Sequence, residues 1–236
     1  MQVLIFELYD KWTLQYKAYC AGSIITNSRV LTSANCFLTN RKRYKKNLSN
    51  IRAVAGIVHT FAKEPIESAI QQWRKIVHLY SQKFFRFPAF DLAILQVNKP
   101  YVFNQFVNKI NYATQNQDYD GVCMSTAVRA VTSWSINKYV YLEEMKLIPR
   151  RRCERILLRS CHTYYCTSND PYYWRADPEI QGGGLICFDT GDPAETDKSQ
   201  GLLVGVTSLV NSGLPDLHTR IGVFNKWVTD DCVRST

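Results

Sequence analysis

The sequence predicts an all-β protein whose antiparallel strands close as barrels or pack as sandwiches. Short runs rich in β-branched and aromatic residues recur along the chain, and polar or Gly/Pro-containing segments separate them. This pattern is typical of antiparallel strands joined by turns. The predicted strands are Val3–Glu7, Gly22–Thr26, Arg29–Thr32, Ile51–Val58, Leu92–Val97, Ala127–Thr132, Tyr139–Leu142 and Leu202–Ser208.

One helix is predicted, near the end of the chain. The apolar residues of Val223–Val228 fall on one helical face, so this stretch favours a short terminal helix. The polar stretch 111–122 has few apolar residues and is predicted to link two halves, residues 1–110 and 123–236.

Composition limits the class of protein. The chain has 236 residues, 46% of them hydrophobic, which excludes a disordered chain. No apolar run approaches the length of about 20 residues that a spanning helix needs. Lys and Arg number 29 against 20 Asp and Glu, so the net charge is +9. Eight cysteines favour an oxidising compartment and hence a secreted protein.

Two further features bear on the compartment. Asn47-Leu48-Ser49 is a candidate N-glycosylation site. Met1 is followed at once by the run Gln2–Phe6, which is too short and lacks the basic leader of a signal peptide. We therefore expect that any signal has been removed or is left out of this sequence.

Three ordered motifs resemble the trypsin-like serine protease family. Cys20–Ile25 followed by Val30–Cys36 is similar to the hairpin that carries the catalytic histidine just before its second cysteine. Phe90–Leu95 resembles the strand that bears the catalytic aspartate, and Gly182–Cys187 the segment after the nucleophile. The resemblance implies two six-stranded antiparallel β-barrels, residues 1–110 and 123–236, with a short C-terminal helix and the active site between the barrels.

Two of the three catalytic positions have lost their chemistry. By this resemblance Asn35 stands at the histidine position, and an amide cannot accept a proton near neutral pH. Gln181 stands at the serine position, so the nucleophilic hydroxyl is absent. Asp91 survives, and we interpret it as a residue kept for structural reasons. The four histidines, at 59, 78, 162 and 218, are interpreted as surface or packing residues, since a substitute base would still lack an oxyanion hole.

The neighbouring positions have changed as well. Glu179 replaces the glycine of the oxyanion loop and places a carboxylate where negative charge would develop. Ile180 replaces the aspartate that pairs with the activated N-terminus in the family, and we expect that N-terminus to be absent here. Loss of both partners avoids an unpaired buried charge.

The resemblance also predicts an altered specificity pocket. Val210 and Asp216 stand where family members have glycines, which narrows the slot, and Arg175 stands at its floor. We expect Arg175 and Asp216 to pair, because a buried charge needs a partner.

By resemblance, three disulfides are expected: Cys20–Cys36, Cys123–Cys187 and Cys153–Cys166. Cys161 and Cys232 are left over, and a fourth bridge between them is one possibility by elimination. The spacing of Cys161, His162 and Cys166 could also suggest metal ligands, but two of these residues have structural explanations. We predict no metal and no cofactor.

Two basic clusters are candidate binding surfaces. The first comprises Arg41, Lys42, Arg43, Lys45 and Lys46, and the second Arg150, Arg151 and Arg152. Such runs either solvate the surface or attract acidic proteins and sulfated glycans. Nucleic acid is not expected, because the chain has no recognised nucleic-acid module.

These features favour a secreted pseudoprotease that acts by binding proteins. The combination resembles the inactivated protease paralogues of parasitic mites, which implies release into the gut lumen and inhibition of host complement components. The alternative is a basic glycan- or membrane-binding defence protein on an inactive protease scaffold. An enzyme with unorthodox chemistry is the third hypothesis.

Overall fold

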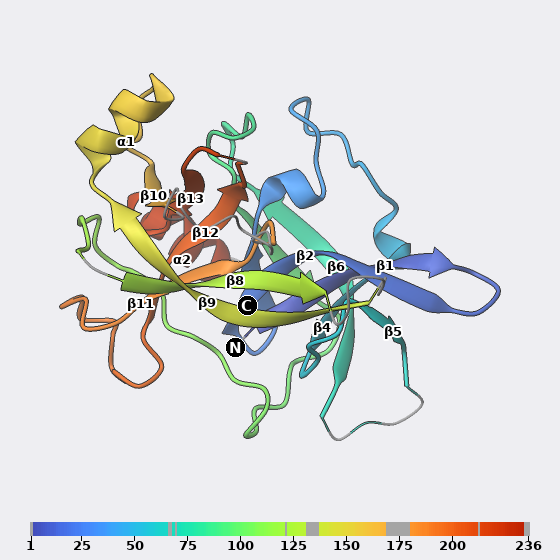
Figure 1. Ribbon diagram of the computed structural model, residues 1–236. Helices are drawn as coiled ribbons and strands as arrows, with labels where there is room; N and C mark the ends of the chain where they lie inside the picture. Colours follow the sequence, from blue (N-terminus) through green and yellow to red (C-terminus); the bar gives the residue numbers. More distant parts are fainter. Residues whose placement is uncertain are drawn as a thin grey trace.

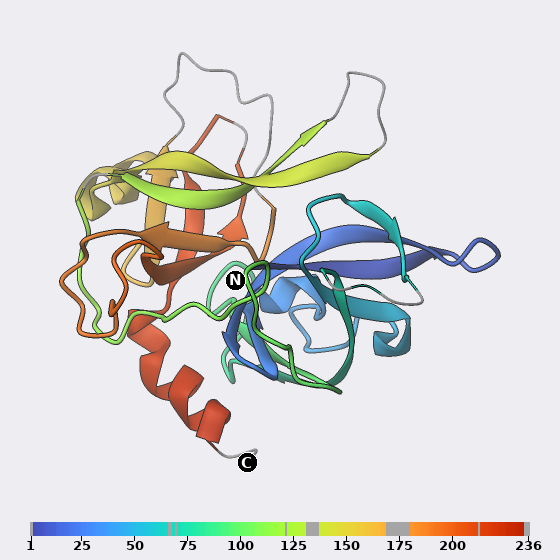
Figure 2. The ribbon, with the colours of Figure 1, turned by 90° about the horizontal axis from the view of Figure 1, so that it is seen from below.

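The computed structural model describes residues 2–65, 68, 70–120, 122–130, 137–168, 180–211 and 213–233. These residues form two antiparallel β-barrels that lie side by side, with a helix at the C-terminal end (Figures 1 and 2). No helix within these residues is long and apolar enough to cross a membrane.

The first barrel contains seven strands: β1 (Gln2–Asp10), β2 (Gln15–Thr26), β3 (Arg29–Thr32), β4 (Ile51–Ala55), β5 (Phe61–Lys63), β6 (Gln72–Ser81) and β7 (Ala93–Val97). Six of them close in the order β1-β4-β6-β7-β3-β2, because β2 pairs back onto β1. β5 pairs with the start of β2, outside this ring. Two 3-10 helices, η1 (Ala34–Cys36) and η2 (Leu48–Asn50), lie between β3 and β4.

The second barrel contains β8 (Val122–Ala130), β9 (Lys138–Ile148), β10 (Tyr164–Ser168), β11 (Gly184–Cys187), β12 (Leu202–Leu209) and β13 (Asp216–Arg220). They close in the order β10-β13-β12-β11-β8-β9. Helix α1 (Arg150–Leu157) lies between β9 and β10, and η3 (Gly222–Phe224) leads into α2 (Asn225–Val233). The prediction of two six-stranded antiparallel barrels and a short C-terminal helix is confirmed.

The elements that sequence patterns missed are β5, β6, β10, β11, β13 and α1. β13 illustrates why such strands were not predicted. Its sequence, Asp-Leu-His-Thr-Arg, is polar and typical of a loop, yet all five residues are buried. Its polar groups find partners on neighbouring strands and loops, so burial does not require apolar residues there. The strand predicted at Ile51–Val58 ends earlier, at Ala55, where Gly56 adopts a positive φ of 71°.

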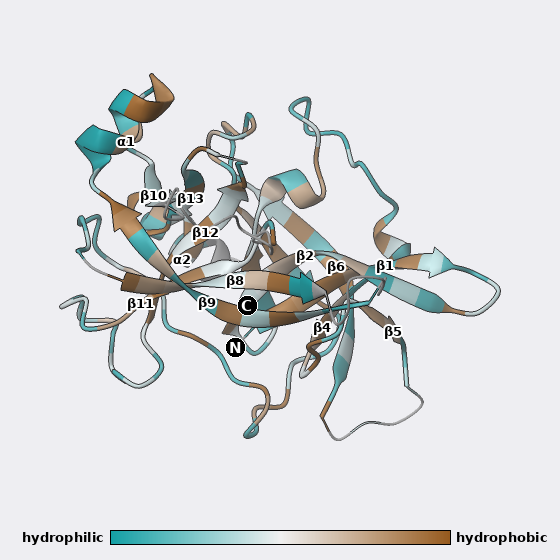
Figure 3. Ribbon diagram, viewed as in Figure 1, coloured by the Kyte–Doolittle hydropathy of each residue, from teal (hydrophilic) through white to brown (hydrophobic). Residues whose placement is uncertain are grey.

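Apolar side chains fill each barrel and also join the two. Figure 3 shows hydrophobic residues concentrated on the strands. One buried cluster contains Leu31 and Ile94 of the first barrel, Leu203 and Val206 of the second, and Val228 of α2. The terminal helix therefore closes the interface between the barrels by burying its apolar face against both.

All three expected disulfides are present, joining Cys20 to Cys36, Cys123 to Cys187 and Cys153 to Cys166. The fourth bridge, from Cys161 to Cys232, is not formed, because Cys161 carries a free, buried thiol.

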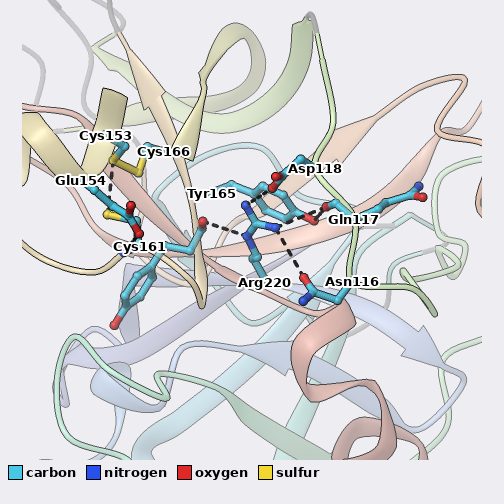
Figure 4. A network of polar contacts seen from close by, with 10 residues as sticks. Asn116, Gln117, Asp118, Cys153, Glu154, Cys161, Tyr165, Cys166 and Arg220 are labelled. Atoms are coloured by element: carbon cyan, nitrogen blue, oxygen red, sulfur yellow. Dashed lines mark hydrogen bonds and ion pairs between the residues drawn. A yellow bond between two sulfur atoms is a disulfide. The ribbon is translucent and has the colours of Figure 1, made fainter. Parts of the chain in front are cut away.

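The position of Cys161 explains the missing bridge. Its thiol packs beside the Cys153–Cys166 disulfide, with Sγ 3.5 Å from that of Cys153, and the backbone N–H of Cys161 donates to Glu154 (Figure 4). Helix α2 packs in a different cluster. Because Cys166 is already bonded to Cys153, one thiol is left among the three sulfurs, too few for a structural metal site.

The polar stretch after β7 is fixed to the second barrel. Ala113 and Asn111 exchange backbone hydrogen bonds with Leu203, and Thr114 donates to the carboxylate of Asp192. Arg220 is buried and donates to Asn116, Gln117 and Asp118 while its guanidinium lies over the Tyr165 ring, as Figure 4 shows. We propose residues 1–110 and 123–236 as the two domains and residues 111–122 as the linker. The contacts of residues 111–118 hold this linker along the second barrel.

Candidate functional site

Asp91 lies at the junction of the two barrels, fully buried just before β7. Its Oδ1 accepts a hydrogen bond from the backbone N–H of Asn35 at 2.8 Å. Its Oδ2 accepts from the hydroxyls of Ser33, at 2.8 Å, and Ser208, at 2.6 Å. Ser33 belongs to the first barrel and Ser208 to β12 of the second. The carboxylate thus joins the barrels through three donors and has no imidazole among these partners.

Asn35 lies in η1, half-buried, with Ser33 capping the helix. Its side-chain Oδ1 accepts from Lys45 at 2.7 Å, and its backbone carbonyl accepts from the same ammonium. Partial burial lowers the pKa of Lys45, and the charge of Asp91 counteracts this effect. The side-chain amide of Asn35 therefore binds the ammonium group of Lys45, and its nitrogen cannot accept a proton.

Gln181 lies at the start of the turn that leads into β11. Its side-chain Nε2 donates to the backbone carbonyl of Ser208 at 2.8 Å, and its own carbonyl accepts from Ala21 at 2.9 Å. Ser208 thus contacts both Asp91 and Gln181, while Asn35 contacts Asp91. Gln181 makes structural contacts to both barrels and offers no nucleophile.

Ile180 is buried in an apolar cluster that spans both barrels, with Leu4 and Phe6 from one and Val128 and Val140 from the other. Its backbone N–H donates to Thr126. An aspartate in this apolar environment would be a buried charge in need of a cationic partner. The apolar side chain of Ile180 offers no carboxylate to an amine, and the loss of the aspartate–N-terminus pair stays a prediction.

The predicted pocket residues are only partly within the described residues. Val210 is half-buried after β12, and Asp216 is buried in β13, where its Oδ1 accepts from the backbone N–H of Asn211 at 2.6 Å. Arg175 and Glu179 lie outside the described residues. The proposed Arg175–Asp216 pair therefore stays a prediction.

Residues 10–228 match the family model described as trypsin. The chain belongs to the trypsin family. It is 21% identical to kallikrein 1-related peptidase b3 of Mus musculus over 233 residues, covering 94% of this chain and 83% of the relative. It is 28% identical to coagulation factor IX of Cavia porcellus over 227 residues, covering 89% and 72%. Coagulation factor IX of Oryctolagus cuniculus is 29% identical over 227 residues, covering 89% and 74%.

The cations of the basic loop, residues 41–46, differ in their contacts. Lys46 forms an ion pair with Glu7 and lies 3.7 Å from the centroid of the Tyr19 ring. Lys45 is bound to Asn35, as described above. Arg41 and Arg43 are exposed and have no ion pair within the described residues. The candidate binding residues of this loop therefore separate into structural lysines and free arginines.

The second basic cluster begins α1. Arg150, Arg151 and Arg152 are exposed, and no acidic residue lies in the first turn of the helix. Cations at a helix N-terminus face the positive end of the helix dipole, so this surface would favour an anion. Asn47, the glycosylation candidate, is exposed and caps η2.

A cavity that was not predicted from the sequence lies beside the basic loop. Arg41 and Lys42 share it with Lys83 and Arg86 from the loop before β7. The run Lys83-Phe84-Phe85-Arg86-Phe87 alternates cations with aromatic residues and could have indicated it.

Burial raises the pKa of Asp91 from 3.8 to about 6, although its hydrogen bonds oppose this change. The folded state therefore binds this proton more tightly than the unfolded chain, whose Asp pKa is about 3.9. The resulting stabilisation is complete below about pH 4 and is lost as pH rises through about 6. Two pKa units correspond to about 3 kcal/mol.

We expect the free energy of unfolding to fall from pH 4 to pH 7 more steeply in the wild type than in Asp91→Asn. Urea unfolding across this range measures both slopes. The comparison with Asp91→Asn removes the contributions of carboxylates such as Asp192, whose pKa is lowered. Identical slopes would contradict the raised pKa of Asp91.

Proposed function

We propose that this trypsin-family protein does not hydrolyse peptide bonds and acts outside the cell by binding other proteins. The observation that carries the proposal is the replacement of base and nucleophile by Asn35 and Gln181, whose amides are engaged by Lys45 and Ser208. In related enzymes, loss of the nucleophile or the base alone lowers kcat by about a millionfold. Asp91 has no imidazole to orient, since its three described donors are a backbone N–H and two hydroxyls.

A substitute base among the histidines has little support. His218 is fully buried, and its two ring nitrogens lie 2.9 and 3.1 Å from the hydroxyls of Thr167 and Thr207. His59, His78 and His162 are exposed. A general base must be held within hydrogen-bond reach of the group that it deprotonates, and the hydroxyls described beside His218 belong to two buried threonines.

The partners that we propose are host-defence proteins, complement components first, with release into the gut lumen. This part depends on the resemblance of the sequence to the inactivated protease paralogues of mites. The exposed arginines 41, 43, 150, 151 and 152 supply positive charge for attraction to acidic protein surfaces. Secretion is supported by the three disulfides.

A serine-directed phosphonate probe and a broad peptide library test the absence of catalysis. We expect no labelling and no turnover above buffer, with an active trypsin-family peptidase as the positive control. Labelling of any residue, or turnover that survives repurification, would contradict the proposal.

The partner is tested by pull-down from host serum. The wild type is compared with a variant neutralised at Arg41, Lys42 and Arg43, and complement components are quantified in both eluates. We expect their enrichment on the wild type and its reduction on the variant. Recovery of no specific serum protein by the wild type would remove the host-defence part.

The exposed cations also favour a second function, binding of sulfated glycans or anionic membranes. Salt distinguishes this function from protein binding. If the exposed cations drive the main interaction, its affinity should collapse between low and physiological salt, because exposed charges are screened within about 8 to 10 Å. An affinity for heparin that does not change between these salt concentrations would argue against the glycan function.

A further inference from the structure

Two loops of the first barrel line an open cavity of about 550 Å³. Its lining residues Ala89 and Phe90 directly precede Asp91 in the chain. One loop follows η1 and the other precedes β7; in Figure 1 both project from the same side of the molecule as α1. The side chain of Asn40 accepts from the backbone N–H of Phe87 at 2.8 Å, and Lys42 donates to the carbonyl of Gln82 at 2.8 Å. These contacts hold the two walls together, so the cavity is built into the fold.

The cavity is strongly cationic. Four of its lining residues are positively charged and none is acidic: Arg41, Lys42, Lys83 and Arg86. Within the described residues none of the four is in an ion pair, in contrast to Lys46, which is paired with Glu7. Unneutralised cations converging on one concave site favour an anion, and guanidinium groups bind tetrahedral oxyanions with two parallel hydrogen bonds.

The cavity also presents aromatic rings. Phe84 is 66% exposed, and its ring centroid lies 6.1 Å from that of Phe90, which in turn packs edge-on against Phe224 at 5.7 Å. Phe90 adopts a φ of 55°, a conformation that costs free energy for an aromatic residue. The exposed ring of Phe84, with the half-buried ring of Phe90 beside it, lines a cationic cavity and favours a ligand with an aromatic body.

We propose that this cavity binds a tyrosine side chain that carries a sulfate or phosphate ester on a partner protein. The proposal specifies the ligand of the protein-binding function above and rests on that function. The oxyanion meets Arg41, Lys83 and Arg86 while the ring stacks with Phe84 and Phe90. A volume of about 550 Å³ lies in the range of pockets that hold drug-sized ligands, so a modified tyrosine side chain has room in it. A sulfated glycan requires only exposed cations and would leave the rings unused.

The test is fluorescence anisotropy with one peptide in three forms: tyrosine-sulfated, tyrosine-phosphorylated and unmodified. We expect the modified peptide to bind at least about tenfold more tightly than the unmodified one, as charge-assisted hydrogen bonds predict. The stronger of the two modified peptides identifies the ester. Equal affinity for all three peptides would overturn the proposal.

The matched variants are Lys83→Ala/Arg86→Ala in the cavity and Lys99→Ala/Lys109→Ala between β7 and β8, which remove the same charge from exposed positions. We expect a loss of about tenfold or more in the first and less than about twofold in the second. Phe84→Ala tests the contribution of the aromatic ring and should weaken the binding of the modified peptide. Equal losses in both double variants would show a general charge effect and overturn the site.

Two additional measurements distinguish failure of the proposed cavity ligand from failure of the proposed non-catalytic function. A heparin oligosaccharide that binds the wild type, and loses affinity in Lys83→Ala/Arg86→Ala while the modified peptides do not bind, would overturn the proposal in favour of a glycan. Phosphonate labelling is measured on the same preparations. Absent peptide binding without labelling rejects the cavity ligand alone, whereas labelling rejects the non-catalytic function whatever the peptides do.

Discussion

Replacing Asp91 by alanine is expected to lower the free energy of unfolding by about 3 kcal/mol at pH 7. The substitution leaves the N–H of Asn35 and the hydroxyls of Ser33 and Ser208 without their acceptor. Each unsatisfied buried donor costs roughly 1 to 3 kcal/mol, and relief of the buried charge offsets part of this sum. The loss falls on the junction of the barrels, so we expect one cooperative transition at lower urea.

Two variants control the measurement by urea unfolding. Asp91→Asn keeps an oxygen for the Asn35 N–H, and the two serine hydroxyls can rotate to accept from its new amide, so its stability should lie within about 1 kcal/mol of the wild type. Asp120→Ala removes an exposed carboxylate and should change little. An Asp91→Ala protein as stable as Asp120→Ala would show that Asp91 is not kept for structural reasons.

The barrels could be predicted from the sequence because their strands carry local apolar patterns and their motifs are contiguous. Cys20–Cys36 and the segment around Asp91 each lie within one short stretch, which makes the residues at the catalytic positions identifiable. The prediction failed where burial depends on distant partners. Arg220 is buried in β13 because Asn116, Gln117 and Asp118 bring their oxygens to it from about a hundred residues away.

The division of the basic loop could not be predicted for the same reason. Arg41 to Lys46 form one run in sequence, but Lys45 reaches Asn35 and Lys46 reaches Glu7, whereas Arg41 faces a cavity completed by Lys83 and Arg86. A loop conformation depends on the elements that it packs against, and these come from other parts of the chain.

Two of the residues at the positions of the family's catalytic triad share one structural property: they connect the barrels. Asp91 links the first barrel to Ser208 of β12, and Gln181 links Ser208 to Ala21 of β2. Selection for these contacts does not require hydrolysis. The contacts of Asp91 and Gln181 can therefore be explained by structure alone. The two loops that line the cavity are not needed for these contacts.

Gly182→Ala tests whether this region connects the barrels. The substitution is expected to lower the free energy of unfolding by more than about 3 kcal/mol, or to prevent folding. Gly182 follows Gln181 and has a φ of 82°. An added Cβ would lie 2.3 Å from the carbonyl oxygen of Ala21 and 2.4 Å from Oγ1 of Thr32, which donates to that same oxygen. Both atoms belong to the first barrel, so the clash would push the barrels apart.

The control is Gly191→Ala, which has a similar φ of 72° but nothing within 4 Å of the added Cβ. This variant measures the cost of a positive φ for alanine, roughly 1 to 2 kcal/mol, without a clash. The difference between the two variants in urea unfolding is then the cost of disturbing the contact between barrels. If both variants lose the same stability, the segment after Gln181 has room to move and does not hold the barrels together.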